Sequence, residues 1–477
     1  MVTLKQVTTT TTSSAWSSFD SSKGATGRGS VPNPSYPIFF FDYQTPQIAV
    51  GYVVGTTGYS YEGQADANYL VVPAMPLTFL GLDYVLGGGG ECGPTNSCMG
   101  NGNDVCGPWW YVLNTSTNTV TTPCNLIASN PLTEHLDSIL ADLINQNLLM
   151  ILGQNEVYNM FIFIIPFSSL SSFITGTYPS TAKWYYAQCP NTTNGRFYTS
   201  TATIYNGNIW QPLSNDSFAG EWVIPLSTVY SGATTGVPSS SSSPISIGTV
   251  YIISTSMSGA DTSIATVIAI SSSSGLTFYI AHMVGQNNAN IFVATLNPSD
   301  GSIVNTGTFT VVNSGSTVNY MKGVFNGVFL YPAQSGSTAY LYTIDPKTMT
   351  IESTSVTGYY ATVGSEGYFV VATTTLTSSS VSWTVYQILL DNTYIFQNTS
   401  ITISGTTVTA TGTLYNETTS SAVSGATVYL VGVNSIDDNY SNDVDVISSG
   451  TTNSNGQFNI SGTYSSTYKY YGVLYVP

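Results

Sequence analysis

Five cysteines are the residues of this chain best suited to covalent chemistry. Four fall in a stretch rich in Gly and Asn and one follows later, at Cys92, Cys98, Cys106, Cys124 and Cys189. No CxxC pair occurs, and the two histidines, His135 and His282, lie outside the stretch, so the spacing favours disulfides over a zinc site. We predict two disulfides, with Cys189 as an alternative partner in one of them, formed in an oxidising compartment or in a hyperthermophile.

An acidic stretch near the C-terminus carries oxygen ligands for a cation, at Asp437, Asn439, Asp443 and Asp445. Side chains of this kind bind Ca²⁺ when one loop presents them together. The stretch lacks the glycine and the terminal glutamate of the EF-hand pattern, so a solvated acidic loop is the alternative. Calcium is the one cofactor that the sequence suggests.

Acid–base catalysis has few candidates in this chain. No Gly-x-Ser-x-Gly elbow, Walker loop or HExxH pattern is present. A glycosidase needs only two carboxylates at the right separation, and the candidates are Glu91, Glu134, Asp137, Glu156 and Glu221. Because no spacing motif pairs them, we expect a protein that is not an enzyme, with a glycan-cleaving protein as an alternative.

Asn-x-Ser/Thr sequons suit a glycosylated surface protein. They occur at Asn114, Asn191, Asn215, Asn398, Asn416, Asn439 and Asn459. Chance alone yields a similar number in a chain this rich in Ser and Thr. Their use as glycan acceptors is therefore a prediction that depends on the exposure of each asparagine.

Charge is scarce and one-sided. Charged residues make up 7% of the 477 residues, and the net charge is −16 at pH 7. Phosphate binding needs clustered cations, so nucleic acid is excluded as a partner. Few carboxylates also leave little stability linked to pH, which suits an acidic and hot setting; a Ser/Thr-rich secreted surface is the plainer alternative. The most apolar run, residues 160–174, is too short to span a membrane and is predicted to be buried core.

The pattern of strands and turns predicts a mainly β, multidomain chain. Residues 1–35 form an extended N-terminal arm, and residues 36–238 form an α+β domain with Cys-rich loops. Its helix begins after Asn130, because the apolar residues that follow recur at helical spacing, namely Leu132, Leu136, Ile139, Leu140 and Leu143.

Residues 245–400 form a β-rich domain that is propeller-like or a sandwich. Its segments 292–303 and 340–351 echo each other 48 residues apart, each as a strand, a turn opened by Asn-Pro or Asp-Pro, and a second strand. The period resembles propeller blades, although this region alone supplies too few of them for a closed ring.

Residues 401–477 contain Gly412-Thr-Leu, Gly425-Ala-Thr-Val-Tyr-Leu and Asn455-Gly456-Gln-Phe. This pattern resembles the small prealbumin-like, Ig-like β-sandwich of carboxypeptidase-regulatory-like surface domains. The resemblance implies a spacer or adhesion module without catalysis. Asn455-Gly456 is expected to supply a tight turn between two strands.

The composition as a whole resembles that of surface and virion proteins of thermoacidophilic archaea and their viruses. We therefore expect a structural virion component such as a spike, turret or tail protein, located on the virion surface. Like subunits, other virion proteins and host glycans or proteins are the expected partners. A cellular S-layer or pilus-type adhesin, extracellular or at the cell surface, is the alternative. The arm and the terminal sandwich are expected at opposite ends, and removal of residues 1–34 is expected to leave the rest folded.

Overall fold

The computed structural model describes residues 1–13, 35–42, 47–54, 74–89, 109–114, 117, 119–121, 135–153, 159–190, 200–215, 218–236, 238, 242–257, 260–286, 290–312, 322–358, 360–364, 367–373, 380–437 and 443–477. Strands dominate these ranges, so the mainly β prediction is confirmed. The helical segments are short: η2 (Thr78–Leu80), η4 (Phe167–Ser169), α1 (Leu170–Ile174) and α2 (Leu226–Gly232). No helix in these ranges is long and apolar enough to cross a bilayer.

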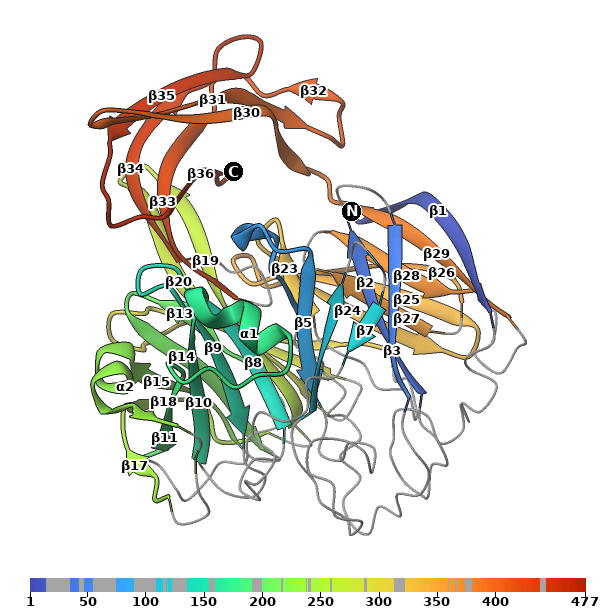
Figure 1. Ribbon diagram of the computed structural model, residues 1–477. Helices are drawn as coiled ribbons and strands as arrows, with labels where there is room; N and C mark the ends of the chain where they lie inside the picture. Colours follow the sequence, from blue (N-terminus) through green and yellow to red (C-terminus); the bar gives the residue numbers. More distant parts are fainter. Residues whose placement is uncertain are drawn as a thin grey trace.

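Groups of four neighbouring antiparallel strands recur along the described chain, and we name them sheets A to F (Figure 1). Sheets A, B and C contain β4 (Ala74–Pro76), β5 (Tyr84–Gly89), β6 (Trp109–Asn114) and β7 (Thr119–Thr121); β8 (His135–Asp142), β9 (Asn147–Gly153), β10 (Asn159–Pro166) and β11 (Lys183–Gln188); and β13 (Thr203–Tyr205), β14 (Asn208–Asn215), β15 (Phe218–Pro225) and β18 (Thr249–Ser254).

Sheets D, E and F contain β19 (Ala260–Ser272), β20 (Gly275–Gln286), β21 (Asn290–Leu296) and β22 (Ile303–Thr310); β23 (Lys322–Phe325), β24 (Val328–Ser335), β25 (Thr338–Asp345) and β26 (Thr350–Thr357); and β27 (Tyr360–Gly364), β28 (Tyr368–Ala372), β29 (Ser380–Leu389) and β1 (Thr3–Ser13). Shorter strands extend these sheets, namely β12 (Ser200–Thr201), β16 (Thr234–Thr235) and β17 (Ile245–Ser246). A separate hairpin joins β2 (Ser35–Asp42) to β3 (Gln47–Val54).

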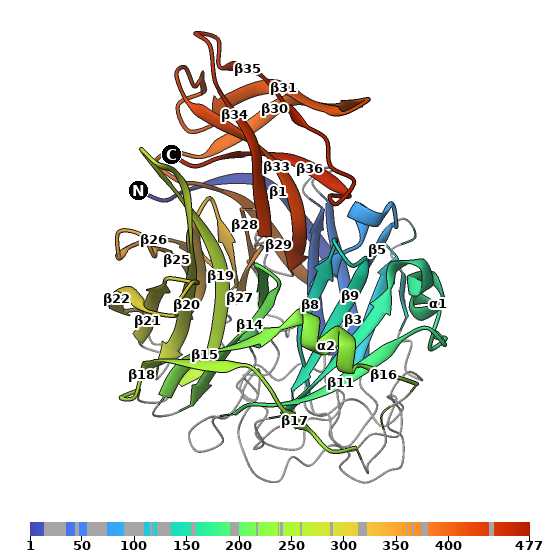
Figure 2. The same ribbon diagram turned by 90° about the vertical axis from the view of Figure 1, so that its left-hand side faces the viewer.

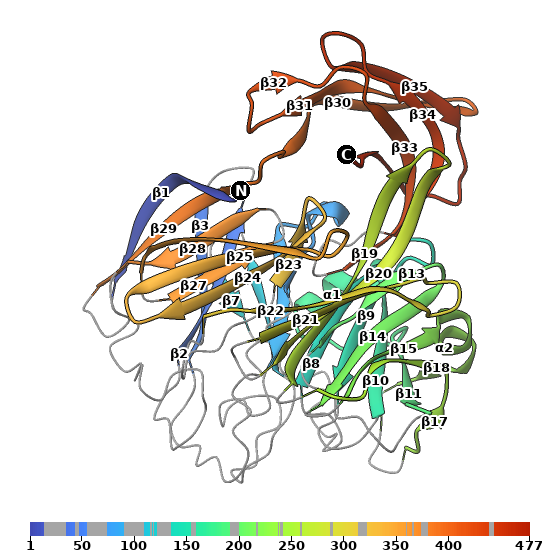
Figure 3. The same ribbon diagram turned by 180° about the vertical axis from the view of Figure 1, so that it is seen from behind.

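Successive sheets share apolar cores between their faces. One core lies between sheets A and B, one between B and C, one between D and E and one between E and F. Each contains residues of both sheets: Leu86 and Phe161, Ile151 and Ile209, Val293 and Phe329, and Leu341 and Phe369. A smaller core with Trp210 and Ile280 joins sheets C and D. Four-stranded antiparallel sheets stacked in chain order are the arrangement of a β-propeller, and Figure 3 shows them side by side.

The echo between residues 292–303 and 340–351 is the same structural unit in sheets D and E. β21 leads through a turn into β22, and β25 leads through a turn into β26. The side chain that opens each turn accepts a backbone N–H two residues on, Ser299 to Asn297 at 3.0 Å and Lys347 to Asp345 at 2.8 Å. The predicted strand, turn and strand are confirmed at both places.

Residues 1–13 of the predicted N-terminal arm are extended, but they form part of a sheet of their own chain. β1 pairs along its length with β29, from Thr3 opposite Leu389 to Ser13 opposite Ser380, and forms the outer strand of sheet F. Val2 is buried in the core between sheets E and F. Residues 1–13 are therefore held in place by β29, a strand more than 360 residues later in the same chain.

The helix expected after Asn130 is wrong for the described residues 135–153. They form β8 and β9, joined by a turn at residues 143–146. From Asp137 to Leu143 every side chain is buried, because neighbouring sheets cover both faces of β8. The region 36–238 is thus mostly β where it is described. The buried-core prediction for residues 160–174 is confirmed for Met160 to Ile165 and for Leu170, Phe173 and Ile174, whereas the serines at 168, 171 and 172 are exposed.

Residues 394–477 form the C-terminal module, which lies above sheets A to F in Figures 1 and 2. One of its sheets contains β30 (Tyr394–Ser404), β31 (Thr407–Asn416), β32 (Ser421–Ala422) and β35 (Gln457–Thr463); the other strands are β33 (Thr427–Asp437), β34 (Asp443–Thr451) and β36 (Tyr470–Tyr475). Leu414 and Phe458 from the first set and Leu430 from the second share one core. The turn predicted at Asn455-Gly456 is confirmed, with Gly456 at a φ of +73°.

Candidate functional site at the base of the C-terminal module

The module is joined to the propeller-like sheets by a shared strand. β33 pairs with β34 and β36 inside the module, and its last residues pair with β8 of sheet B, Ser435 opposite Asp142 and Asp437 opposite Leu140. The N–H of Leu143 donates to the carbonyl of Asn434 at 2.9 Å. The main-chain hydrogen-bond ladder of sheet B therefore extends through β33 into the module. We call this pairing of β8 with β33 the seam.

Carboxylates from both sides are buried at the seam. Asp142 lies at the end of β8 and Asp443 at the start of β34, and they are 3% and 5% exposed. Asp142 accepts the hydroxyl of Tyr230 at 2.5 Å and the N–H of Asn145 at 3.0 Å. Asp443 accepts the N–H of Asn206 at 2.9 Å. Backbone and phenol donors thus satisfy charges that would be costly to bury alone.

Burial raises the pKa of Asp443 to about 6, and repulsion from the Asp445 and Asp142 carboxylates adds to this, while hydrogen bonds oppose it. A carboxyl whose folded pKa is raised binds its proton more tightly in the folded chain than in the unfolded one. Stability is therefore greatest below the unfolded pKa and falls as the pH rises from about 4 to about 6. The buried Asp443 carboxyl therefore favours the folded chain more at low pH than at neutral pH.

Asp443→Asn should remove this part of the pH dependence, because an amide keeps the acceptor for Asn206 without the buried charge. We expect the variant to gain on the order of 2–3 kcal/mol over the wild-type chain at pH 7 and to match it at pH 4. Urea unfolding at both pH values measures the difference. Asp83→Asn, at an exposed carboxyl, is the control; an equal gain from both variants at pH 7 would contradict a role for the seam.

An aromatic cluster forms a second contact between the module and the sheets. Lys469 of the module lies 5.4 Å from the centroid of the Phe167 ring and 5.7 Å from that of Tyr470. Phe79 packs edge-on against both rings, at centroid distances of 6.1 and 6.5 Å, and its carbonyl accepts the Tyr470 hydroxyl at 2.6 Å. Phe79 belongs to η2 and Phe167 to η4, so this contact anchors the module on sheets A and B.

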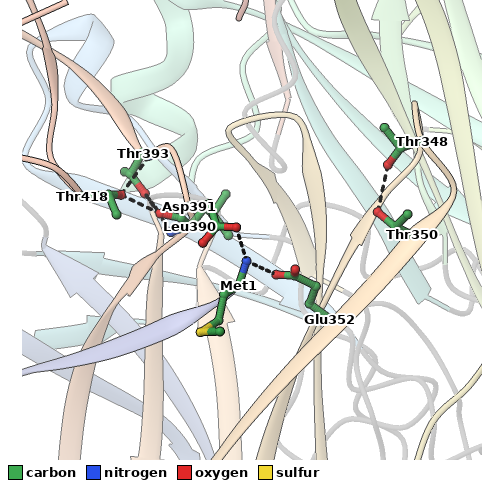
Figure 4. Close-up of polar contacts among 8 residues, drawn as sticks. All are labelled: Met1, Thr348, Thr350, Glu352, Leu390, Asp391, Thr393 and Thr418. Atoms are coloured by element: carbon green, nitrogen blue, oxygen red, sulfur yellow. Dashed lines mark hydrogen bonds and ion pairs between the residues drawn. The ribbon is translucent and has the colours of Figure 1, made fainter.

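The linker at residues 390–393 makes the third contact, and Figure 4 shows how the N-terminus holds it. The amine of Met1 lies 2.5 Å from Asp391 in the linker and 2.7 Å from Glu352 in β26. Partial desolvation lowers the pKa of this amine, but the hydrogen bonds to Asp391 and Glu352 outweigh it and raise the pKa. The N-terminus therefore lies at the base of the module, and the expectation that the two occupy opposite ends is wrong.

The residues predicted for disulfides and calcium are only partly described. Cys92, Cys98, Cys106 and Cys124 lie outside the described residues, and Cys189 is buried in the core between sheets B and C. Asn439 is also outside them, while Asp437, Asp443 and Asp445 lie on β33 and β34. Asp445 accepts the Tyr468 hydroxyl at 2.7 Å. Within the described ranges no group of three or more His, Cys, Asp or Glu side chains could hold a metal ion.

Two of the carboxylates considered for glycan cleavage are described, and both are buried. Asp137 of β8 is 1% exposed and Glu221 of β15 is 0% exposed. Glu221 Oε1 lies 2.5 Å from Nδ1 of His282 in β20, so the pair links sheets C and D. Burial raises the pKa of Glu221, and the His282 ring opposes this only in part. Neither carboxylate can reach a glycan. Glu91, Glu134 and Glu156 lie outside the described residues.

The described sequon asparagines differ in exposure. Asn398 and Asn459 are exposed, Asn114 at the end of β6 is half-buried, and Asn416 is 7% exposed. Asn215 ends β14. Asn191 and Asn439 lie outside the described residues. The strand pattern alone gives the exposure of Asn459, because it alternates with the apolar residues Phe458 and Ile460.

Sequence reasoning missed the residues that join the module to the sheets, namely Asp142, Tyr230, Phe79, Phe167, Lys469 and the Met1 amine. They come from segments hundreds of residues apart, and no local pattern connects them. One usable signal was the polar sequence Asn145-Gln146-Asn147 between two apolar runs. It marks a turn rather than a helix interior, and would have placed Asp142 at the end of a strand.

No family model matches this chain, and no curated protein does. Several solved structures are similar to it. A protein from Lactobacillus plantarum is 10% identical, with 72% of this chain and 94% of that one covered and a TM-score of 0.35. The Dos1 propeller is 10% identical over 83% of this chain and 92% of its own, with a TM-score of 0.34. An oligogalacturonate lyase in complex with manganese is 10% identical over 83% and 85% of the two chains, also with a TM-score of 0.34. Likenesses at this level carry no conclusion about what the chain does.

Proposed function

We propose that this chain is a structural component of a virion surface, a spike, turret or tail protein that takes part in assembly and host attachment. The observation that carries the proposal is the way in which the C-terminal module is attached to the propeller-like sheets. Three contacts hold it on one side of the propeller-like sheets: the seam, the aromatic cluster around Lys469 and the linker clamped by Met1. A module held in this way is suited to being presented at a fixed angle, whereas a tethered spacer would need a free linker.

Chemistry at the seam supports an acidic setting for this role. The buried Asp443 carboxyl stabilises the joint in its protonated form, so the module is held most firmly at low pH. The resemblance of residues 401–477 to prealbumin-like surface domains supports a role in adhesion. Host-surface glycans or proteins are the proposed partners of the module, and like subunits or other virion proteins those of the sheets.

Fractionation of an infected culture tests the proposal. Antibodies raised against the C-terminal module should detect the chain in the virion band of a density gradient, label the particle surface and reduce attachment to host cells several-fold. Antibodies against an internal virion protein serve as the control for particle integrity. Detection in envelopes of uninfected cells would instead favour the S-layer or pilus-type adhesin. Release of reducing sugars from host envelopes by the purified chain would favour the glycan-cleaving alternative.

A further inference from the structure

The C-terminal module contains three sequons whose asparagines are described, Asn398, Asn416 and Asn459, and the structure gives them different environments. Transfer of a glycan requires that the asparagine Nδ2 attack C1 of a lipid-pyrophosphate-linked oligosaccharide. The new N–C bond forms as the C1–O bond to the pyrophosphate breaks, and Nδ2 loses one proton to a base of the transferase. An acceptor must therefore present its amide nitrogen, with the hydroxyl two residues later, to a large enzyme.

Asn459 meets this requirement on the open face of β35. Gln457, Asn459 and Ser461 are exposed, whereas Phe458 and Ile460 point into the core. Because side chains two apart on a strand share a face, the Asn459 amide and the Ser461 hydroxyl lie on the same solvent-facing side. The Ser461 hydroxyl shares an exposed hydrogen bond with Thr409 at 2.9 Å, which a transferase can displace at the surface, whereas the Asn416 amide is buried. Figure 3 shows that β35 and its neighbour β31 form the part of the module farthest from the sheets.

Asn398 meets the requirement through a bulge in β30. The pairing with β31 shifts between Gln397 and Ser400, which frees Asn398 and Thr399 from the ladder. Asn398 has a φ of +53°, and residues 398–400 are all exposed. A bulge re-aims the residues it contains and leaves their main chain unpaired. Asn398 and the hydroxyl of Ser400 are therefore accessible together.

The side chains of the sequon at Asn416 instead form hydrogen bonds within the structure. Asn416 Nδ2 donates to the side chain of Asn392 at 3.1 Å, and its Oδ1 accepts the N–H of Thr419 at 3.1 Å. The Thr418 hydroxyl donates to the carbonyl of Leu390 at 2.5 Å and accepts the N–H of Thr393 at 3.1 Å. Figure 4 shows Thr418 against the linker. Both groups that a transferase would use are bonded to residues 390–393.

We infer that Asn398 and Asn459 are N-glycan acceptors of the folded module, and that Asn416 and Thr418 are not an acceptor site but a clamp on the linker. The inference is independent of the virion proposal, because it rests on accessibility alone. Its consequence is that the sugars extend from the outermost sheet of the module, away from the joint.

The test uses the folded, full-length chain incubated with membranes that contain an oligosaccharyltransferase and a lipid-linked oligosaccharide. Peptide mass spectrometry should find glycan on Asn398 and Asn459 and none on Asn416. Asn398→Gln and Asn459→Gln should each remove the glycan at their own position. Asn416→Gln should remove none, and should lower the urea midpoint of unfolding, because the clamp loses its hydrogen bonds.

Two controls make each outcome decisive. A short acceptor peptide in the same reaction shows that the transferase is active, and a peptide covering residues 412–422 shows whether the Asn416 sequon is used when it is unfolded. We expect the second peptide to be glycosylated. Glycan on Asn416 of the folded chain, or bare Asn398 and Asn459 beside a glycosylated control peptide, would overturn the inference.

Discussion

A chain that lacks residues 1–13 should lose on the order of 5 kcal/mol of stability, through exposed apolar side chains and unpaired β29 hydrogen bonds. β1 covers the outer edge of sheet F, and Val2 fills the core between sheets E and F, where Leu4 also packs. Truncation also removes the Met1 amine, which pairs with the carboxylates of Glu352 and Asp391. This differs from the expectation that the arm can be removed without harm to the remainder.

Urea unfolding and hydrogen exchange of the truncated chain measure this effect. Exchange should accelerate first at β29, whose hydrogen bonds face β1. Val2→Ala is the intermediate case and should cost about 1–2 kcal/mol, since it removes two buried methyl groups. Val7→Ser, at a side chain that is 37% exposed, is the matched control in the same strand and should change little. Native protection at β29 after truncation would contradict the role of β1.

The second large effect is expected at the buried pair of Glu221 and His282, which joins sheets C and D. Replacing either residue alone with Leu leaves the other polar group buried in an apolar interface without its partner. Removing one partner of a buried pair typically costs about 3–5 kcal/mol. The double variant, with Leu at both positions, should recover most of this loss, because neither member of the pair then remains buried without the other.

A double-mutant cycle on urea midpoints measures the coupling between the two residues. Thr343→Val, which removes one buried hydroxyl from sheet E, is a control and should cost about 1 kcal/mol. Single variants that cost no more than this control would show that the pair does not hold the two sheets together. Additive single effects would show that the two side chains act independently.

The sequence predicts the β-rich character and the repeating unit because both depend on local pattern. Asn297 and Asp345 open equivalent turns, and each turn lies between two strands that the local sequence marks by apolar and β-branched residues. The predicted helix is wrong for the described residues 135–153, and the reason is physical. β9 is a continuous apolar run, and in β8 the buried polar residues Asp137 and Ser138 separate apolar residues whose spacing matches a helix by chance.

The joint at the base of the module was beyond sequence reasoning, because each of its contacts joins distant segments. Asp142 meets Ser435 only because β8 offers β33 a free edge, and Met1 meets Asp391 only because β1 completes sheet F. The sequence analysis considered a propeller-like arrangement only for residues 245–400. Sheets A to C were missed because the apolar residues of β8 and β9 were interpreted as the helix of an α+β domain.

The closure of sheet F by β1 also sets the order of events during synthesis. β1 is synthesised well before β29, since Met1 and its partner Asp391 are 390 residues apart. At typical translation speeds this delay is roughly 20–80 s, during which β1 has no strand to pair with. Its sequence TLKQVTTTTTS is suited to remaining unpaired during this interval, because the threonines and the lysine keep it hydrated and disfavour pairing with other nascent chains. Sheet F, and with it the contact between Met1 and the linker, can therefore form only after β29 and residues 390–393 have been made.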